Sequence, residues 1–447
     1  MNEKFDFKSN LLIGSLLFGL FFGAGNLIFP VHMGQLAGEN TLKATIGFLI
    51  TGVGLPMLGV LAAAVCQSRS LYDMAKPVSK TYSILFTCML YLTIGPLFAI
   101  PRTATVSFEV GLNPFIGTEY SRVGLFVFSF AFFIITLYYS LRPGRILDWI
   151  GKYLTTVFVV LLSILLIATY IKPMGQASQY AAQGNYRDKP LFTGILEGYH
   201  TMDALASLAF AIVIIANVEK MGARTPGRKT MEILKSGLIC AAGMSIIYAS
   251  LAYMGATSLG SVGSADNGAR IMSMVSEHYF GIFGKILLAA IVTVACLKTA
   301  IGLITSCAQM FGEMFPKLLT HNQYAVVFTL LSFIIANFGL NNIIELSVPV
   351  LMFLYPLAIT LMVLSMLAPI INKQKDIFRW TTAFTIVSAF FDFCNALPQA
   401  LRENEIVGKL ISFAQVFLPG FNFGFGWILP ALLGFCIGTV IWKVRKC

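Results

Sequence analysis

Charged residues are scarce in this sequence. Only 11% of its 447 residues are Asp, Glu, Lys or Arg, whereas 57% are hydrophobic. The charges gather in short stretches between long apolar runs, which leaves no long polar segment for a soluble domain. A composition of this kind is typical of an integral membrane protein.

The motifs of several catalytic chemistries are also missing. The sequence contains no Walker motif, no HExxH and no haem signature, and its cysteines form no CxxC pair. Its intramembrane polar residues suggest no pair of nucleophile and base and no metal cluster. We therefore expect neither an enzyme nor a resident cofactor, and any work that the protein performs must be driven by an ion gradient.

The chain has a formal net charge of +11 at pH 7. Because this basic surplus is confined to segments between apolar runs, it is typical of cytoplasmic membrane loops rather than of a surface that binds nucleic acid. The sequence thus predicts membrane lipid as a partner and no nucleic-acid partner, and it specifies no oligomeric state.

Twelve apolar runs are long enough to cross a bilayer, whose core takes about 20 helical residues. They fall near residues 11–30, 42–66, 84–107, 123–141, 150–171, 192–217, 233–256, 282–308, 324–340, 344–368, 379–398 and 424–442. The segment "LNNIIE" separates the ninth run from the tenth. Most Lys and Arg lie on the inner side if both termini are cytoplasmic, so the positive-inside rule places residues 1–10 and 443–447 in the cytoplasm.

The first span contains a cluster of helix breakers. In "FFGAGNLIFP", Gly23, Gly25, Asn26 and Pro30 interrupt an otherwise apolar helix. Such residues are tolerated at membrane depth where the freed backbone lines a cavity or is buried in protein. One interpretation is a glycine face for helix packing. Asn26 and Pro30 together favour the other, an unwound segment that faces a ligand.

The sixth span carries a carboxylate. The segment "EGYHTMDALAS" places His200, Thr201 and Asp203 before a longer apolar stretch. A carboxylate within a bilayer is costly, so its presence is a functional hypothesis by default. The alternative is that Asp203 merely lies near the outer mouth of the protein.

The two interrupted spans are five apart. Broken helices at corresponding places of two five-helix halves indicate an inverted-repeat transporter with its substrate held between the breaks. Freed N–H groups at the start of a half-helix bind a carboxylate, and freed carbonyls bind a cation or an ammonium group. An amino acid zwitterion satisfies both kinds of group and is therefore a natural substrate.

Several motifs point to one family. "FFGAGNLIFP", "GPLFAIPRTATVSFEVG", "GYHTMDALASLAFAIVI", "ACLKTAIGL" and "LSVPVL" together resemble the branched-chain amino acid:cation symporters of bacteria. The resemblance implies an all-α LeuT-like carrier with a 5+5 inverted repeat over residues 11–171 and 192–368, followed by two helices over 379–442. It also implies import of leucine, isoleucine and valine across the cytoplasmic membrane, usually with sodium.

The resemblance also implies roles for individual residues. It places the substrate at the breaks of the first and sixth spans, with Gly23, Ala24, Gly25, Asn26, Thr201, Asp203 and Ser207. It places the cation sites at Gly19, Phe22, Asn26, Lys298 and Thr299. Either a gating or a structural role is expected for Arg102, Thr103 and His200. Arg102 suits an anchor on the carbonyl end of a half-helix at least as well as a substrate contact.

Lys298 departs from the family pattern, which has a small or apolar residue before the threonine of the eighth span. It lies near the centre of that span, with its backbone roughly 15 to 18 Å from each interface at 1.5 Å per residue. A lysine side chain cannot snorkel that far. We hypothesise that its ammonium group replaces sodium at the second cation site, near Gly19, Phe22 and Thr299, so that uptake becomes proton-driven or sodium-independent.

Two alternatives stay open at this point. In the first, Lys298 forms a structural ion pair with Asp203 or Asp392, and the protein is a conventional sodium symporter. In the second, the same fold carries another small substrate, such as a different neutral amino acid or a nucleobase. In each case the coupling ion is sodium or a proton, and no other metal is expected.

Overall fold

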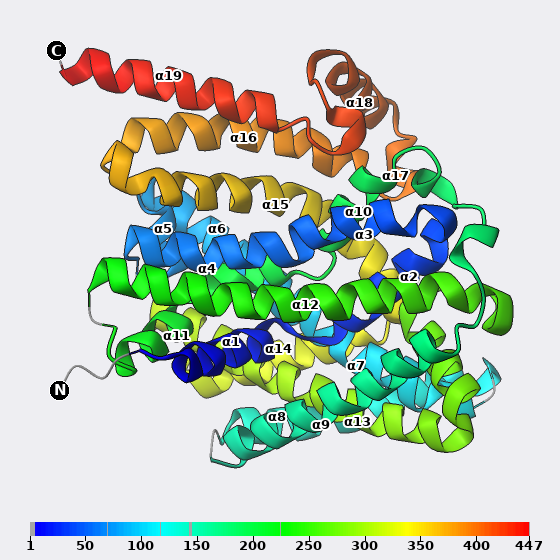
Figure 1. Ribbon diagram of the computed structural model, residues 1–447. Coiled ribbons are helices and arrows are strands. Elements are labelled where there is room, and N and C mark those ends of the chain that lie inside the picture. The colour runs from blue at the N-terminus through cyan, green and yellow to red at the C-terminus, as the bar shows by residue number, and fades with distance from the viewer. Residues whose placement is uncertain (1–4, 69, 117, 143–144, 224, 447) are drawn as a thin grey trace.

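The computed structural model describes residues 5–68, 70–116, 118–142, 145–223 and 225–446, so residues 1–4 and 447 of the predicted terminal segments lie outside it. Every regular element in these ranges is helical. Figure 1 shows the two termini at the same end of the molecule. An all-α membrane protein was predicted from the apolar runs, and the fold class is confirmed.

The helices of the first half follow the predicted spans closely. They are α1 (Phe7–Phe21), α2 (Ala24–Ala37), α3 (Thr41–Leu49), α4 (Leu55–Cys66), α5 (Leu71–Ala75), α6 (Lys80–Leu92), α7 (Ala99–Gly111), α8 (Ser121–Ser140) and α9 (Arg145–Ile171). A π-helical turn over Ile50–Gly54 joins α3 to α4, and another over Thr93–Leu97 joins α6 to α7.

The second half contains longer helices. They are α10 (Pro190–Tyr199), α11 (Asp203–Lys220), α12 (Pro226–Val262), α13 (Gly268–Met314), α14 (His321–Ala336), α15 (Leu340–Ile371), α16 (Lys375–Asn395), α17 (Gln399–Arg402), α18 (Glu405–Phe417) and α19 (Ile428–Lys446). Helix α13 is kinked at Gly281, whose φ of 63° lies in the left-handed region.

Span boundaries are where sequence and structure differ. Among the described residues, seven helical stretches are long and apolar enough to cross a membrane, and α10 with α11 form an eighth that is bent by 44°. The count of twelve therefore stays a prediction. The segment "LNNIIE" was predicted to separate two spans, which is wrong, because it forms the start of α15. The chain turns before it, at Gly339, whose φ of 84° favours glycine.

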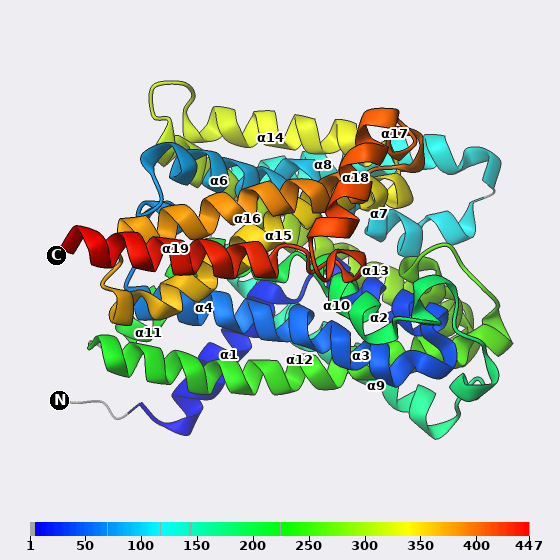
Figure 2. The same cartoon turned by 90° about the horizontal axis from the view of Figure 1, so that it is seen from above.

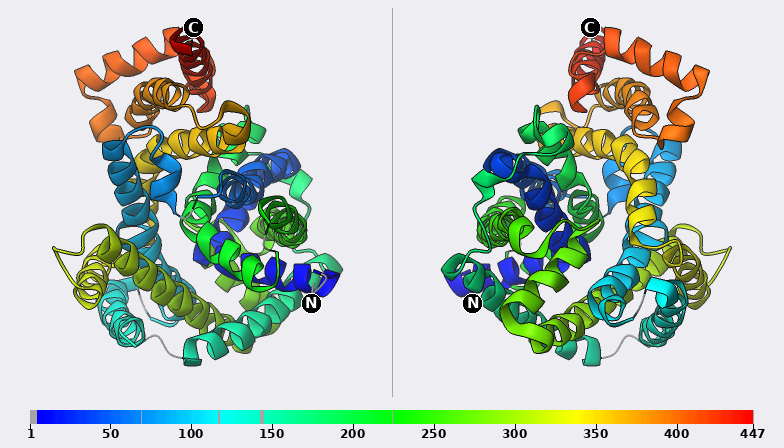
Figure 3. Two further views of the ribbon diagram at one scale, coloured as in Figure 1. Left: turned by 90° about the vertical axis from the view of Figure 1, so that its left-hand side faces the viewer. Right: turned by 90° about the vertical axis from the view of Figure 1, so that its right-hand side faces the viewer.

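The helices form two groups in space. Figure 3 shows α1–α4 and α10–α12 as an inner bundle, with α6–α9 and α13–α15 curving around it as an arc. Helices α16, α18 and α19 lie outside this arrangement, at the top of Figures 1 and 3, and they therefore overlie the other helices in the view from above in Figure 2. The two interrupted helices of the sequence, α1 with α2 and α10 with α11, both belong to the inner bundle.

Two glycines allow close packing inside the bundle. A Cβ atom at Gly34 of α2 would overlap the backbone of Ala252, and one at Gly255 of α12 would overlap the Val31 carbonyl oxygen. Small residues at helix crossings let backbones approach in this way. The contact fixes α12 against the half-helix that follows the first break.

We predict that Gly255→Ala destabilises the protein by ~1–3 kcal/mol through overpacking, although alanine favours helix by up to ~1 kcal/mol. The matched control is Gly243→Ala on the same helix, where a Cβ meets nothing within 4 Å. Thermal unfolding of the purified protein measures the difference. Equal melting temperatures for the two variants would contradict this account of the packing.

Candidate transport site

The first helix break lies at Phe22 and Gly23, between α1 and α2. Gly23 is extended, with φ −123° and ψ −168°, and α2 begins at Ala24. The side-chain oxygen of Asn26 accepts a hydrogen bond from the Gly23 N–H at 3.0 Å. Asn26 thus satisfies a backbone donor that the break has freed, as capping side chains do at helix starts.

The second break lies at residues 200–202, between α10 and α11. Met202 has a φ of 63°, in the left-handed region, and α11 begins at Asp203. The Thr201 hydroxyl donates to the Gly198 carbonyl at 2.9 Å and accepts from the Asp203 N–H at 3.4 Å. Both breaks therefore satisfy freed backbone groups with their own polar side chains.

A buried network joins the two breaks. The Asn26 amide nitrogen donates to Asp203 Oδ2 at 2.5 Å, and the Tyr248 hydroxyl donates to the same oxygen at 3.3 Å. The Asn26 amide also contacts the Tyr248 hydroxyl directly. At most 3% of each of the three side chains is exposed. Helices α2, α11 and α12 thus meet at one carboxylate.

Tyr248 was not predicted as a site residue. It lies in the apolar run of the seventh span, where the sequence also places Tyr253, and nothing in the pattern separates the two tyrosines. The close approach of α12 to α2 is what brings Tyr248 to Asn26.

A central cavity of about 200 Å³ lies at the breaks. Predicted site residues in its wall are Gly19, Gly23, Ala24, Gly25, Asn26, Arg102, Thr103, Thr201, Asp203, Lys298 and Thr299. The apolar part of its wall comes from Leu20, Phe21, Ile94, Ala99, Met202, Ala206, Phe210, Val213 and Leu303. One cavity therefore combines backbone ends, a carboxylate and an apolar surface.

Ser207 lies elsewhere. Its hydroxyl donates to the Ala204 carbonyl at 2.7 Å, and the side chain packs against Gly59 of α4. The face of α11 that lines the cavity runs through Asp203, Ala206 and Phe210 instead. Successive helical residues are about 100° apart, so Ser207 points past the edge of that face.

A second, smaller cavity of about 30 Å³ adjoins the end of α1. Its wall includes Gly19, Phe22, Gly23, Lys298 and Thr299, so four residues predicted for the second cation site lie around one space. The volume is on the scale of one or two water molecules. The Thr299 hydroxyl donates to the Ala295 carbonyl at 3.1 Å.

Arg102 of α7 anchors the end of α10. Its Nη1 donates to the His200 carbonyl at 2.7 Å and its Nη2 to the Thr201 carbonyl at 3.5 Å. The carbonyl end of a helix carries partial negative charge, which a guanidinium neutralises. Neighbouring Thr103 donates to the Ile100 carbonyl at 2.6 Å.

His200 faces a different space. It lies in the wall of a vestibule of about 530 Å³, together with His32, Glu197, Asp266 and Glu345. Its Nδ1 is 3.7 Å from the Glu197 carboxylate. The vestibule is larger than the central cavity, but its wall includes His200 alone of the break residues and neither Asn26 nor Asp203. We therefore place the site in the central cavity, whose wall contains residues of both breaks.

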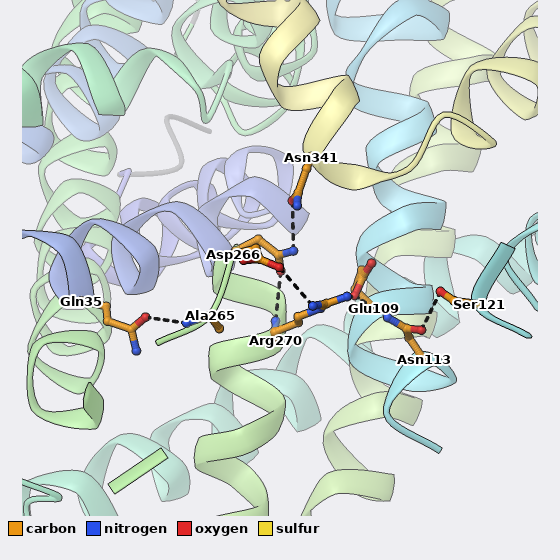
Figure 4. A network of polar contacts seen from close by, with 9 residues as sticks. Gln35, Glu109, Asn113, Ser121, Ala265, Asp266, Arg270 and Asn341 are labelled. Carbon is orange, nitrogen blue, oxygen red and sulfur yellow. Dashed lines mark hydrogen bonds and ion pairs between the residues drawn. The ribbon is translucent and has the colours of Figure 1, made fainter. Parts of the chain in front are cut away.

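A polar network holds the rim of the vestibule together, and Figure 4 shows it from close by. Arg270 of α13 binds Glu109 of α7 at 3.2 Å and Asp266 at 3.1 Å. Asn267, which caps α13, donates to Asn341 at the start of α15 at 3.1 Å. The start of α13 is thereby tied to two other helices of the arc.

Comparison with known proteins settles the family. Residues 6–445 match the family described as branched-chain amino acid transport protein. The chain belongs to this family. Branched-chain amino acid permease BrnQ of Lactobacillus delbrueckii subsp. lactis is 44% identical over 100% of this chain and 99% of its own length. Permease BraB of Bacillus subtilis (strain 168) is 42% identical over 99% of this chain and 97% of its own length.

Solved structures agree on the fold. Mhp1, a nucleobase-cation-symport-1 family transporter, has a TM-score of 0.60 in a closed conformation, at 13% identity over 98% of this chain and 93% of its own. Its inward-facing conformation has a TM-score of 0.63, at 13% identity, over 97% of this chain and 91% of its own. This family member is a multi-pass membrane transporter with a LeuT-like fold, not an enzyme.

We predict that Tyr248→Phe lowers the free energy of unfolding by ~1–3 kcal/mol, because a buried acceptor at Asp203 loses a donor. Tyr253→Phe on the same helix is the control, since no described residue hydrogen-bonds its hydroxyl. Thermal unfolding of the two variants provides the measurement. Loss of stability in Tyr253→Phe alone would show that the buried network does not hold the breaks together.

Proposed function

We propose that the protein imports leucine, isoleucine and valine across the cytoplasmic membrane by secondary active transport, with both termini in the cytoplasm. The observation that carries the proposal is the central cavity, where two helix breaks, one carboxylate and an apolar wall meet. Relatives named branched-chain amino acid permeases match the chain over nearly its whole length and favour this substrate over a nucleobase.

The cavity accommodates each part of an amino acid. The substrate carboxylate binds near the freed N–H groups at the start of α2, at Ala24 and Gly25, where the helix end is positive. Its ammonium group binds the Asp203 carboxylate, on which Asn26 and Tyr248 both use Oδ2. The branched side chain contacts Phe210 and the rest of the apolar wall.

Lys298 determines the coupling ion in this proposal. Its position beside Gly19, Phe22 and Thr299 supports an ammonium group in place of a second sodium. If the lysine keeps its charge, uptake needs one sodium fewer. If it gains and loses a proton in each cycle, uptake is proton-coupled. In the structural alternative, Lys298 instead forms an ion pair with Asp203 or Asp392, and the protein is a conventional sodium symporter.

We predict that a sodium gradient stimulates leucine uptake by the reconstituted protein weakly or not at all. We also predict that Lys298→Thr makes uptake strongly sodium-stimulated, because a hydroxyl pair at positions 298 and 299 binds sodium. Uptake is measured in liposomes with an imposed sodium gradient, an imposed proton gradient or neither. The control is Lys285→Thr on the same helix, whose lysine pairs with Glu277.

Strong sodium stimulation of the unmodified protein would reject the role of Lys298 and leave a conventional sodium symporter. Absence of leucine uptake under every gradient would reject the substrate assignment itself.

We predict that Asp203→Asn raises the KM for leucine by roughly tenfold or more, because a charge-assisted hydrogen bond to the ammonium group is lost. Asn keeps the size of the side chain, so the protein still folds. Asp392→Asn serves as the control, since Asp392 is buried in α16 outside the central cavity. An unchanged KM in Asp203→Asn would place the ammonium group elsewhere.

A further inference from the structure

The two basic residues in the wall of the central cavity occupy equivalent places in the sequence. Residues 102–104 read Arg-Thr-Ala and residues 298–300 read Lys-Thr-Ala. The first triplet lies on α7, in the third span, and the second lies on α13, in the eighth. These spans are five apart, as are the two broken spans, so the inverted repeat relates Arg102 to Lys298.

Arg102 binds the carbonyl end of one broken helix, and Lys298 lines a small cavity at the carbonyl end of the other. Arg102 donates to the carbonyls of His200 and Thr201 at the end of α10. Lys298 shares the small cavity at the end of α1 with Gly19 and Phe22. Helix carbonyl ends attract cations. In both cases a helix of the arc presents a basic residue to a helix of the inner bundle.

Arg102 also separates two spaces. Its guanidinium carbon lies 5.0 Å from the centre of the Phe29 ring, and that ring lies 5.2 Å from the His200 ring. Arg102 is in the wall of the central cavity, whereas Phe29 and His200 are in the wall of the vestibule. The three side chains therefore form a thin partition between the two spaces.

The partition is closely packed. A Cβ atom at Gly25 would lie 2.8 Å from Arg102 Nη2, so the guanidinium rests directly on the start of α2. Only 4% of Arg102 is exposed. The side chain thus contacts both half-helices that flank the partition, α2 and α10.

We propose that Arg102 and Lys298 are reciprocal latches, which hold the inner bundle to the arc on the vestibule side and on the side of the termini, respectively. Opening the cavity to the vestibule requires release of Arg102 from the end of α10, and opening it to the other side requires release of Lys298 from the end of α1. The proposal rests on the proposed function, because only a carrier needs two alternating openings.

The test measures access to the cavity rather than transport. A single cysteine at Ala99, in the cavity wall, is introduced into protein whose native cysteines are replaced by alanine. A membrane-impermeant maleimide is then applied from either side of oriented liposomes, without substrate. Arg102→Gln is expected to raise labelling from the vestibule side by about tenfold, the scale of one charge-assisted hydrogen bond. Lys298→Gln is expected to raise labelling from the side of the termini.

Further variants separate a latch from a structural role. The control is Arg379→Gln. Arg379 also donates to a backbone carbonyl, that of Val78, but it lies away from the cavity. This variant should leave labelling unchanged. Phe29→Ala should act like Arg102→Gln if Arg102→Gln fails to fold. Unchanged labelling in both partition variants, or the same direction of change for Arg102→Gln and Lys298→Gln, would overturn the proposal. If the two variants raise labelling from opposite sides but the protein takes up no leucine, only the substrate assignment is rejected.

Discussion

Backbone groups without a hydrogen-bond partner are costly inside a bilayer, and this constraint governs the centre of the protein. Two interrupted helices free N–H and carbonyl groups at membrane depth. Asn26 satisfies the Gly23 N–H, Thr201 accepts from the Asp203 N–H, and Arg102 binds the carbonyls at the end of α10. The polar side chains that make up the site are thus those that the breaks require. A binding site and a stable fold arise from the same contacts.

Close helix packing brings these groups together. Gly255 and Tyr248 are seven residues apart on α12, which is about two helical turns, so both face α2. Gly255 allows the backbones to approach at Val31, and Tyr248 then reaches Asn26 and Asp203. The arc helices α7 and α13 complete the cavity with Arg102 and Lys298. A packing contact in the middle of α2 therefore helps to position the Asp203 carboxylate beside the start of that helix.

Part of this arrangement could be predicted from the sequence. Helix breakers and an intramembrane carboxylate are rare, so Asn26 and Asp203 identified both breaks. Residues whose role depends on the rotation of a helix or on a distant contact are harder to predict from the sequence. Ser207 differs from the cavity face by one helical position, and Tyr248 depends on the approach of α12. The turn near Gly339 was misplaced because a polar segment continued as helix.

The central claim is that an amino acid binds between the two helix breaks. A cryo-EM map of the protein with leucine bound tests it most directly. We predict density in the central cavity, with the ammonium group beside Asp203 and the carboxylate at the start of α2. Density for leucine only in the vestibule, beside Glu197 and Asp266, would contradict the account.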